Sequence, residues 1–182
     1  DKVVFTSAYC NQCIYCYTGR GTQCLNKKKL PKRIEFEGGM LGGGLSEYLA
    51  IPAWQLINVP ADANLDHLAL TEPLACCIHS VEKANIRAGE VVVIIGVGIM
   101  GLLHLKLVKM KGAYVVVSEP NEARRQKALK NGADVVINPL EVDFVKEVKS
   151  LTNKLGVDVV FNTIANPGVW EEAIAVLAPY GR

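Results

Sequence analysis

The sequence has little excess charge, no long apolar run and no internal repeat. Among its 182 residues, 20 Lys and Arg stand against 18 Asp and Glu, a formal net charge of +2. A balance so close to neutral lacks the basic character of nucleic-acid-binding domains, so we expect no nucleic-acid partner. The most apolar segment, 91–105, is too short for a membrane span and contains three glycines and a histidine, so we expect no membrane partner.

Length and composition describe a globular chain of one to two domains. Half of the residues are apolar and 21% are charged, which is enough apolar material to bury a core. No signal peptide is visible. The chain opens on Asp1 without an initiator methionine and closes on Gly181 and Arg182 after an apparent turn, so we expect it to be a piece of a longer protein.

Four cysteines form the most specific pattern near the N-terminus. Their spacing, Cys-x2-Cys-x2-Cys-x7-Cys, lets one loop surround a single ion, as tetrahedral zinc requires. Four sulfur ligands leave no open coordination position for water or substrate, so such a zinc ion holds the loop together and does not catalyse. The predicted structural zinc ligands are Cys10, Cys13, Cys16 and Cys24.

The arrangement of these cysteines favours a zinc site over disulfides, free thiols or a redox switch. An oxidised, secreted chain would not gather four of six cysteines within fifteen residues and leave Cys76 and Cys77 adjacent in an apolar stretch. A redox switch needs an exposed cysteine of low pKa, which a closed four-sulfur site does not offer. We therefore expect a reducing compartment, the cytoplasm, with Cys76 and Cys77 as small buried hydrophobic residues.

The pattern changes near residue 73. Before it, short extended pieces are expected at 2–6, 45–51 and 56–59, with a solvated basic turn at 27–29 and a glycine-rich stretch at 38–44. No helical pattern or closing lysine follows the glycines, so they indicate a turn between strands and not a phosphate loop. We place the domain boundary here, giving domains 1–72 and 73–182.

The second part alternates helices and strands, which indicates a parallel sheet. Its strands are continuous runs of Val and Ile, as expected for strands covered on both faces. The fold class is therefore α/β, with a doubly wound parallel sheet that is incomplete within this chain. Helices are expected at 73–85, 99–111, 121–131, 142–153 and 168–177, and strands at 91–95, 114–118, 135–137 and 157–161.

The segment from Gly96 to Gly101 fits G-x-G-x-x-G, and its sequence context makes this short motif a specific signal. It directly follows a strand, opens a helix, and is followed 18 residues later by Glu119 at the end of the next strand. Gly96 permits the tight turn, and Gly98 lets a pyrophosphate approach the backbone. Gly101 lets the helix pack close to the sheet, while the amides of the first helical residues, Ile99 and Met100, face the anion.

The position of Glu119 helps to decide between NAD and NADP as the cofactor. Its carboxylate can accept hydrogen bonds from the ribose hydroxyls of NAD and would repel the 2′-phosphate of NADP, so NAD is favoured over NADP. Arg124 and Arg125 instead favour NADP, because a guanidinium turned inward could meet its 2′-phosphate. For Arg125 we expect a solvated position in the first turn of a helix.

Together these motifs resemble one family, the zinc-dependent medium-chain alcohol dehydrogenases. Within it, Glu-Pro-Leu-Ala at 72–75, Ile-His at 78–79 and Gly-Leu-Ser-Glu-Tyr at 44–48 are most similar to the polyol (sorbitol-like), butanediol and threonine dehydrogenase branch. The resemblance runs through the whole chain. It implies part of a β-rich GroES-like catalytic domain followed by a Rossmann NAD-binding domain, in a homo-oligomer when the protein is complete.

The resemblance also implies an activity, the oxidation of a secondary alcohol to a ketone with hydride transfer to NAD(P). A second, catalytic zinc takes Glu72 as a ligand or as a supporting residue behind the ligands; a plain helix cap is the alternative for Glu72. Arg124 matches a basic position beside the adenosine ribose. Thr163 and Ile164 match backbone that flanks the cofactor.

The other catalytic ligands of the family and its proton relay precede the cysteine loop and lie outside this chain. His79 is seven residues from Glu72, about 10 Å along one helix, and cannot share an ion with it. His67, expected in a loop, and His104, expected in a helix, receive no catalytic role. Two hypotheses stay open: the middle of a working zinc-dependent dehydrogenase, or a catalytically inactive fragment that binds structural zinc and nucleotide.

Overall fold

The computed structural model divides into two compact units, Asp1–Ala69 and Leu70–Arg182. The unit boundary falls close to the change of pattern in the sequence. No helix in the described part of the chain is long and apolar enough to cross a membrane. The structure describes residues 1–29, 35–36, 39–40 and 47–182.

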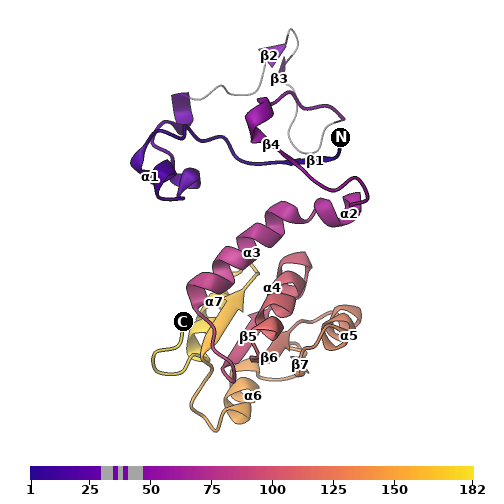
Figure 1. Ribbon diagram of the computed structural model, residues 1–182. Helices are drawn as coiled ribbons and strands as arrows, with labels where there is room; N and C mark the ends of the chain where they lie inside the picture. The colour runs from indigo at the N-terminus through magenta and orange to yellow at the C-terminus, as the bar shows by residue number, and fades with distance from the viewer. Residues whose placement is uncertain (30–34, 37–38, 41–46) are drawn as a thin grey trace. The chain divides into compact units, whose positions relative to one another are not determined.

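The second unit is built on a four-stranded parallel sheet with the order β7-β6-β5-β8 (Figure 1). The chain runs outward from β5 to β6 and β7, then returns to the other side of β5 to form β8, so the strand order reverses beside β5. This order confirms the predicted doubly wound sheet. The strands are β5 (Val91–Ile95), β6 (Tyr114–Ser118), β7 (Val135–Ile137) and β8 (Val159–Asn162).

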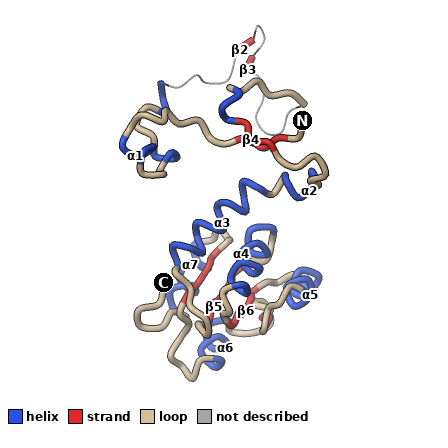
Figure 2. Tube along the Cα trace, viewed as in Figure 1, coloured by secondary structure: helices blue, strands red, loops and turns tan. Residues whose placement is uncertain are grey.

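Helices cover both faces of the sheet (Figures 1 and 2). On one face, α3, α4 and α5 pack on a core that includes Val92, Ile94 and Val117; on the other, α6 and α7 pack on Val93 and Ile95. Successive residues of β5 thus enter opposite cores, which explains why the strand is apolar at every position. The helices are α3 (Thr71–Ala84), α4 (Ile99–Met110), α5 (Glu122–Lys130), α6 (Phe144–Leu151) and α7 (Pro167–Ala175).

Short polar side chains fix where three of these helices begin. Asn121 accepts a hydrogen bond from the Arg124 amide at 3.0 Å, and Asp143 accepts one from the Lys146 amide at 3.0 Å. Asn166 caps α7 in the same way, with Pro167 as the first helical residue. Each cap satisfies an amide that lacks a partner inside its helix. The predicted α5, α6 and α7 therefore start within two residues of the expected positions.

The last residues of the chain lie against β8. The amide of Arg182 donates to the Asp158 carbonyl at 3.0 Å, and its carbonyl accepts from the Val160 amide at 2.9 Å. The Arg182 guanidinium also reaches the Asn85 carbonyl at 3.0 Å and the Glu90 carboxylate at 2.8 Å. This arrangement links the outer edge of β8 to the end of α3.

The first unit consists of short elements. β1 (Val3–Phe5) pairs antiparallel with β4 (Leu56–Asn58), and β2 (Glu35–Phe36) pairs antiparallel with β3 (Gly39–Met40). The lysine turn is a 3-10 helix in which Lys27 and Lys28 are exposed, as expected of a solvated basic turn. The other elements are the helices α1 (Ile14–Tyr17) and α2 (Leu65–Leu68), and 3-10 turns at Gly21–Gln23, Lys27–Lys29 and Ala53–Gln55.

Several local expectations need correction. His67 lies in α2 and not in a loop, because the Asn64 side chain caps a short helix there. α3 begins at Thr71, two residues before Pro73, which its first turn tolerates since that amide needs no helical partner. Of the expected extended piece 45–51, residues 47–51 form no strand and the rest lies outside the described residues, as does most of the glycine stretch 38–44.

The adjacent cysteines were also predicted incorrectly in part. Cys77 is fully buried between α3 and α4, and its thiol lies 3.8 Å from the Met100 carbonyl. Cys76 is exposed and donates a hydrogen bond to a Glu72 carboxylate oxygen at 3.5 Å. Residues one apart on a helix point about 100° apart, and on α3 this turn directs Cys77 toward α4 while Cys76 faces solvent.

Candidate functional site: a four-sulfur cluster and a glycine turn

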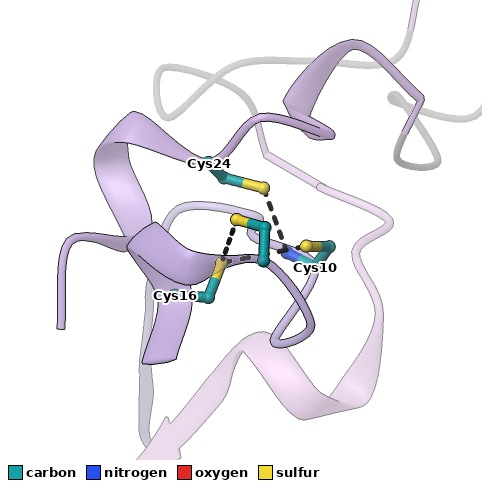
Figure 3. A group of neighbouring side chains, drawn as sticks. Cys10, Cys16 and Cys24 are labelled. Atoms are coloured by element: carbon teal, nitrogen blue, oxygen red, sulfur yellow. Dashed lines mark hydrogen bonds between the residues drawn. The ribbon is translucent and has the colours of Figure 1, made fainter. Parts of the chain in front are cut away.

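The four cysteines of the N-terminal loop come together. Their sulfur atoms all lie within 4.8 Å of one another, with Cys13 and Cys16 at 3.4 Å and Cys10 and Cys16 at 3.8 Å. Sulfurs bound tetrahedrally at about 2.3 Å from zinc are roughly 3.8 Å apart. Figure 3 shows the sulfurs of Cys10, Cys16 and Cys24 turned toward a common centre. The donor set and its spacing therefore fit a zinc ion.

Hydrogen bonds from the loop support negative charge on one of these sulfurs. The Asn26 side-chain amide donates to Cys10 Sγ at 3.3 Å, and the Gln12 backbone amide donates to the same sulfur at 3.4 Å. These donors, Asn26 first, lower the pKa of Cys10 to about 6, whereas burial and the neighbouring Cys13 sulfur raise the pKa of Cys16 to about 11. Four thiolates at this spacing need a cation among them.

Asn26 is a contributor that the spacing rule did not reveal. It lies two residues beyond Cys24, just before the lysine turn, and only the folded loop brings its amide to Cys10. Such outer partners orient metal ligands and tune their charge. Nothing in the sequence pattern distinguishes Asn26 from an ordinary loop asparagine.

The glycine turn joins the carboxyl end of β5 to α4. Gly96 adopts a φ of +83°, which only glycine accepts readily, and its carbonyl accepts a hydrogen bond from the Thr163 hydroxyl at 3.1 Å. A Cβ on Gly101 would lie 2.0 Å from the Gly96 carbonyl oxygen, so this helix packs against the turn only because Gly101 has no side chain. A Cβ on Gly98 would meet nothing within 4 Å. Open space therefore faces the backbone at Gly98.

The first turn of α4 borders this open space. Its N-cap is Gly98, and no side chain of the described residues caps the helix. Ile99 and Met100 are exposed at 62% and 37%, although both are large and apolar. A 12-residue helix with an uncapped N-terminus at the point where strand order reverses has the geometry that binds pyrophosphate in doubly wound sheets.

Glu119 follows β6 and reaches across to the glycine turn. One carboxylate oxygen accepts from the Val97 amide at 3.0 Å, and the other accepts from the Asn121 amide at 3.0 Å. The residue is only 3% exposed. An ionised carboxylate keeps further lone pairs after two such bonds, so it can still accept from a hydroxyl. The carboxylate is thus fixed between the two loops that border the open space.

The two arginines after Glu119 behave differently from each other. Arg124 is exposed, at 59% of its side chain, and its guanidinium lies 3.9 Å from the Glu119 carboxylate. Arg125 was expected in solvent and is instead 9% exposed, with hydrogen bonds to the carbonyls of Glu119 and Pro120. Its position in α5 places it on the face that packs toward the sheet, next to Ala128.

The remaining predicted residues lie on two other elements. Thr163 and Ile164 follow β8, and their side chains would lie 2.8 Å from a Cβ on Gly96, so they contact the glycine turn. Glu72 is exposed in the first turn of α3; the N-cap position is Leu70, so the helix-cap interpretation of Glu72 is wrong. In the described part of the chain, the four cysteines are the one group of three or more metal-binding side chains, and it does not include Glu72.

Comparison with known proteins connects these features. The profile of the family described as zinc-binding dehydrogenase matches residues 88–182, and that of the alcohol dehydrogenase GroES-like domain matches residues 1–61. L-threonine 3-dehydrogenase of Pyrococcus furiosus is 38% identical over 180 residues, which are 98% of this chain and 49% of that protein. Sorbitol dehydrogenase of Halalkalibacterium halodurans is 31% identical over 186 residues, covering 100% of this chain and 52% of that protein.

A solved structure gives the same result. A protein of Sinorhizobium meliloti that is described as a zinc-binding dehydrogenase, bound to NADP, superposes with a TM-score of 0.82 at 30% identity and covers 98% of this chain and 52% of its own. The chain thus spans about half the length of the proteins it matches. Because the dehydrogenase profile alone covers more than half of these residues and the GroES-like profile covers most of the rest, the chain belongs to the zinc-binding alcohol dehydrogenase family.

Proposed function

We propose that this chain is the central part of a zinc-dependent, NAD-linked dehydrogenase that oxidises a secondary alcohol to a ketone. The observation that carries the proposal is the glycine turn, where open space at Gly98 adjoins the fixed carboxylate of Glu119. The matching relatives are dehydrogenases of threonine and of sorbitol, so we propose an alcohol of the polyol, diol or threonine type.

The residues of the chain would bind and orient the cofactor. The backbone at Gly96, Gly98 and Gly101, with the amides of Ile99 and Met100, would hold the pyrophosphate. Glu119 would accept hydrogen bonds from the adenosine ribose, and Arg124 would lie beside it. Thr163 and Ile164 would flank the nucleotide on the β8 side.

Two zinc ions have different roles in this proposal. Cys10, Cys13, Cys16 and Cys24 would hold a structural zinc ion that fixes the loop. Glu72 would hold a catalytic zinc ion, directly or from behind its ligands, at the N-terminus of α3, where the helix dipole favours a carboxylate. When bound, the catalytic zinc supplies Lewis acidity toward the alcohol oxygen, and the nicotinamide supplies a hydride acceptor.

We favour NAD over NADP on electrostatic grounds. Glu119 is buried and held by two backbone amides, so its charge stays where the 2′-phosphate of NADP would be. The Sinorhizobium meliloti protein binds NADP, which makes this choice a direct subject for experiment. Calorimetric titration with both nucleotides decides it: we expect binding of NAD at least about tenfold tighter, a difference of about 1.4 kcal/mol.

The alternative is a chain that binds structural zinc and nucleotide without turnover. It is favoured by the finding that, within the described residues, no second metal-binding group gathers around Glu72. Native mass spectrometry that reads chain mass and zinc per chain together, followed by an assay for alcohol-dependent NADH formation, separates the two functions. One zinc ion and tight NAD binding without NADH formation would support the alternative, and turnover would refute it.

We also propose that the protein works in a reducing compartment. All six cysteines lie in the described residues and are unpaired, which suits a reducing compartment such as the cytoplasm. We further propose that the full-length protein is a homo-oligomer.

A further inference from the structure

Arg125 is a cation withdrawn from solvent into the second unit. Its residue exposure is 9%, and its guanidinium has three acceptors. Nη1 donates to the carbonyl of Glu119 at 2.9 Å and to that of Pro120 at 2.6 Å, while Nη2 pairs with the Glu122 carboxylate. A charge is kept out of water only when it is paired and hydrogen-bonded, and the planar fork of arginine can serve several acceptors at once.

The two carbonyls belong to the loop that presents Glu119. That loop is also held through a side chain, because the Glu119 carboxylate accepts from the amide of Val97 in the glycine turn. The backbone of Glu119 is thus fixed by α5 and its side chain by the β5–α4 turn. If the guanidinium were removed, the carbonyl of buried Glu119 and that of exposed Pro120 would both lose this donor, and the loop could shift toward water to recover hydrogen bonds.

We propose that Arg125 is a positioning residue for the adenosine end of the nucleotide. It holds the Glu119 loop in the geometry that bridges to Val97, and it does so without touching the cofactor. The inference rests on the proposed nucleotide-binding function. Its exposed neighbour Arg124, 3.9 Å from the Glu119 carboxylate, is placed to meet the nucleotide directly. In this proposal Arg124 contacts the nucleotide, whereas Arg125 positions the loop that carries Glu119.

A pair of matched substitutions separates these roles. Arg125→Gln and Arg124→Gln each remove one positive charge from adjacent positions of α5, the first from a buried guanidinium and the second from an exposed one. We expect Arg125→Gln to weaken binding of ADP-ribose to the full chain by about tenfold or more, the loss expected for charged hydrogen bonds. Amide hydrogen exchange is the second readout. Exchange at Val97 and Asn121, the two amides held by Glu119, should become at least about tenfold faster in Arg125→Gln and stay unchanged in Arg124→Gln.

Exchange in the sheet controls for loss of structure. The amides of Ile94 and Val116, in the centre of β5 and β6, should stay protected in both variants. Should Arg125→Gln lose this protection, Arg125→Lys replaces it, since lysine keeps the charge but cannot serve three acceptors in the same geometry.

The outcomes distinguish this inference from the proposed function. A wild-type chain that fails to bind ADP-ribose overturns the nucleotide function and, with it, the positioning role. A wild-type chain that binds, together with an Arg125 variant of equal affinity or of unchanged exchange at Val97 and Asn121, overturns the positioning role alone. Weaker binding with faster exchange at those two amides, and an intact sheet, supports it.

Discussion

The substitution Gly101→Ala is the sharpest test of the packing at the glycine turn. Alanine usually stabilises a helix when it replaces glycine, whereas here it should destabilise the protein. Alanine in place of glycine inside a helix ordinarily stabilises by about 1 kcal/mol. Here the new Cβ would lie 2.0 Å from the Gly96 carbonyl oxygen, whereas contacts under 3.0 Å are essentially never found. α4 and the turn would have to move apart by roughly 1 Å, a displacement typical of overpacked cores.

The turn cannot move easily to relieve this contact. The Gly96 carbonyl accepts from the Thr163 hydroxyl at 3.1 Å, and the Gly96 amide donates to the Ser118 carbonyl at 2.8 Å. Overpacking commonly costs about 1–3 kcal/mol and more where the neighbours are fixed. After the helix gain is subtracted, we expect Gly101→Ala to destabilise the second unit by about 2 kcal/mol, which lowers its Tm by roughly 10 °C.

Gly98 provides the matched control within the same turn. Its φ of −64° suits any residue, and a Cβ there would meet nothing within 4 Å. Gly98→Ala should therefore leave the free energy of unfolding within about 0.5 kcal/mol of wild type. It should nevertheless weaken NAD binding by about tenfold or more, because the methyl group occupies the space proposed for the pyrophosphate.

Thermal and urea unfolding followed by circular dichroism, with calorimetric titration of NAD, measures both variants. A Gly101→Ala chain as stable as wild type would refute the packing argument. A Gly98→Ala chain that binds NAD with wild-type affinity would refute the placement of the pyrophosphate.

The zinc loop and a buried histidine give three further predictions. Cys24→Ser should lower zinc content from one ion per chain to well below one, measured by elemental analysis, because three sulfurs no longer complete the site. Asn26→Ala should speed zinc release to a chelator by about tenfold through loss of its hydrogen bond to Cys10. Burial lowers the pKa of His104, opposed by its bond to the Met100 carbonyl, so its contribution to stability is present above about pH 6.5 and is lost as pH falls. Relative to His104→Phe, wild type should then lose up to about 1.4 kcal/mol per pH unit in urea unfolding below pH 6.5.

Controls for these three measurements are available in the chain. Lys28→Ala, at an exposed position beyond the cluster, should release zinc at the wild-type rate, and equal rates for Asn26→Ala would contradict the role of Asn26. Full zinc retention by Cys24→Ser would contradict the four-sulfur site. Parallel pH profiles for wild type and His104→Phe would show that His104 has an ordinary pKa in the folded chain.

Features with a short-range cause were predictable from the sequence. Continuous Val and Ile runs gave the strand positions of β5, β6 and β7, since a strand covered on both faces must be apolar at each residue. The cysteine spacing predicted the group of four neighbouring sulfurs because all four residues lie in one loop. The glycine pattern gave the turn because a φ of +83° and a helix contact without a side chain leave few alternatives to glycine.

Tertiary structure decided which polar side chains are held inside. Arg124 and Arg125 are adjacent and chemically identical, yet one is exposed and the other holds the Glu119 loop, because α5 turns about 100° per residue and one side chain alone meets the sheet. Cys76 and Cys77 separate in the same way on α3. Asn26 reaches Cys10 only after the loop has closed. The sequence by itself determined the main helices and strands of the second unit and the motif residues, whereas the partners of buried charges and amides depend on contacts between distant segments, which no local pattern encodes.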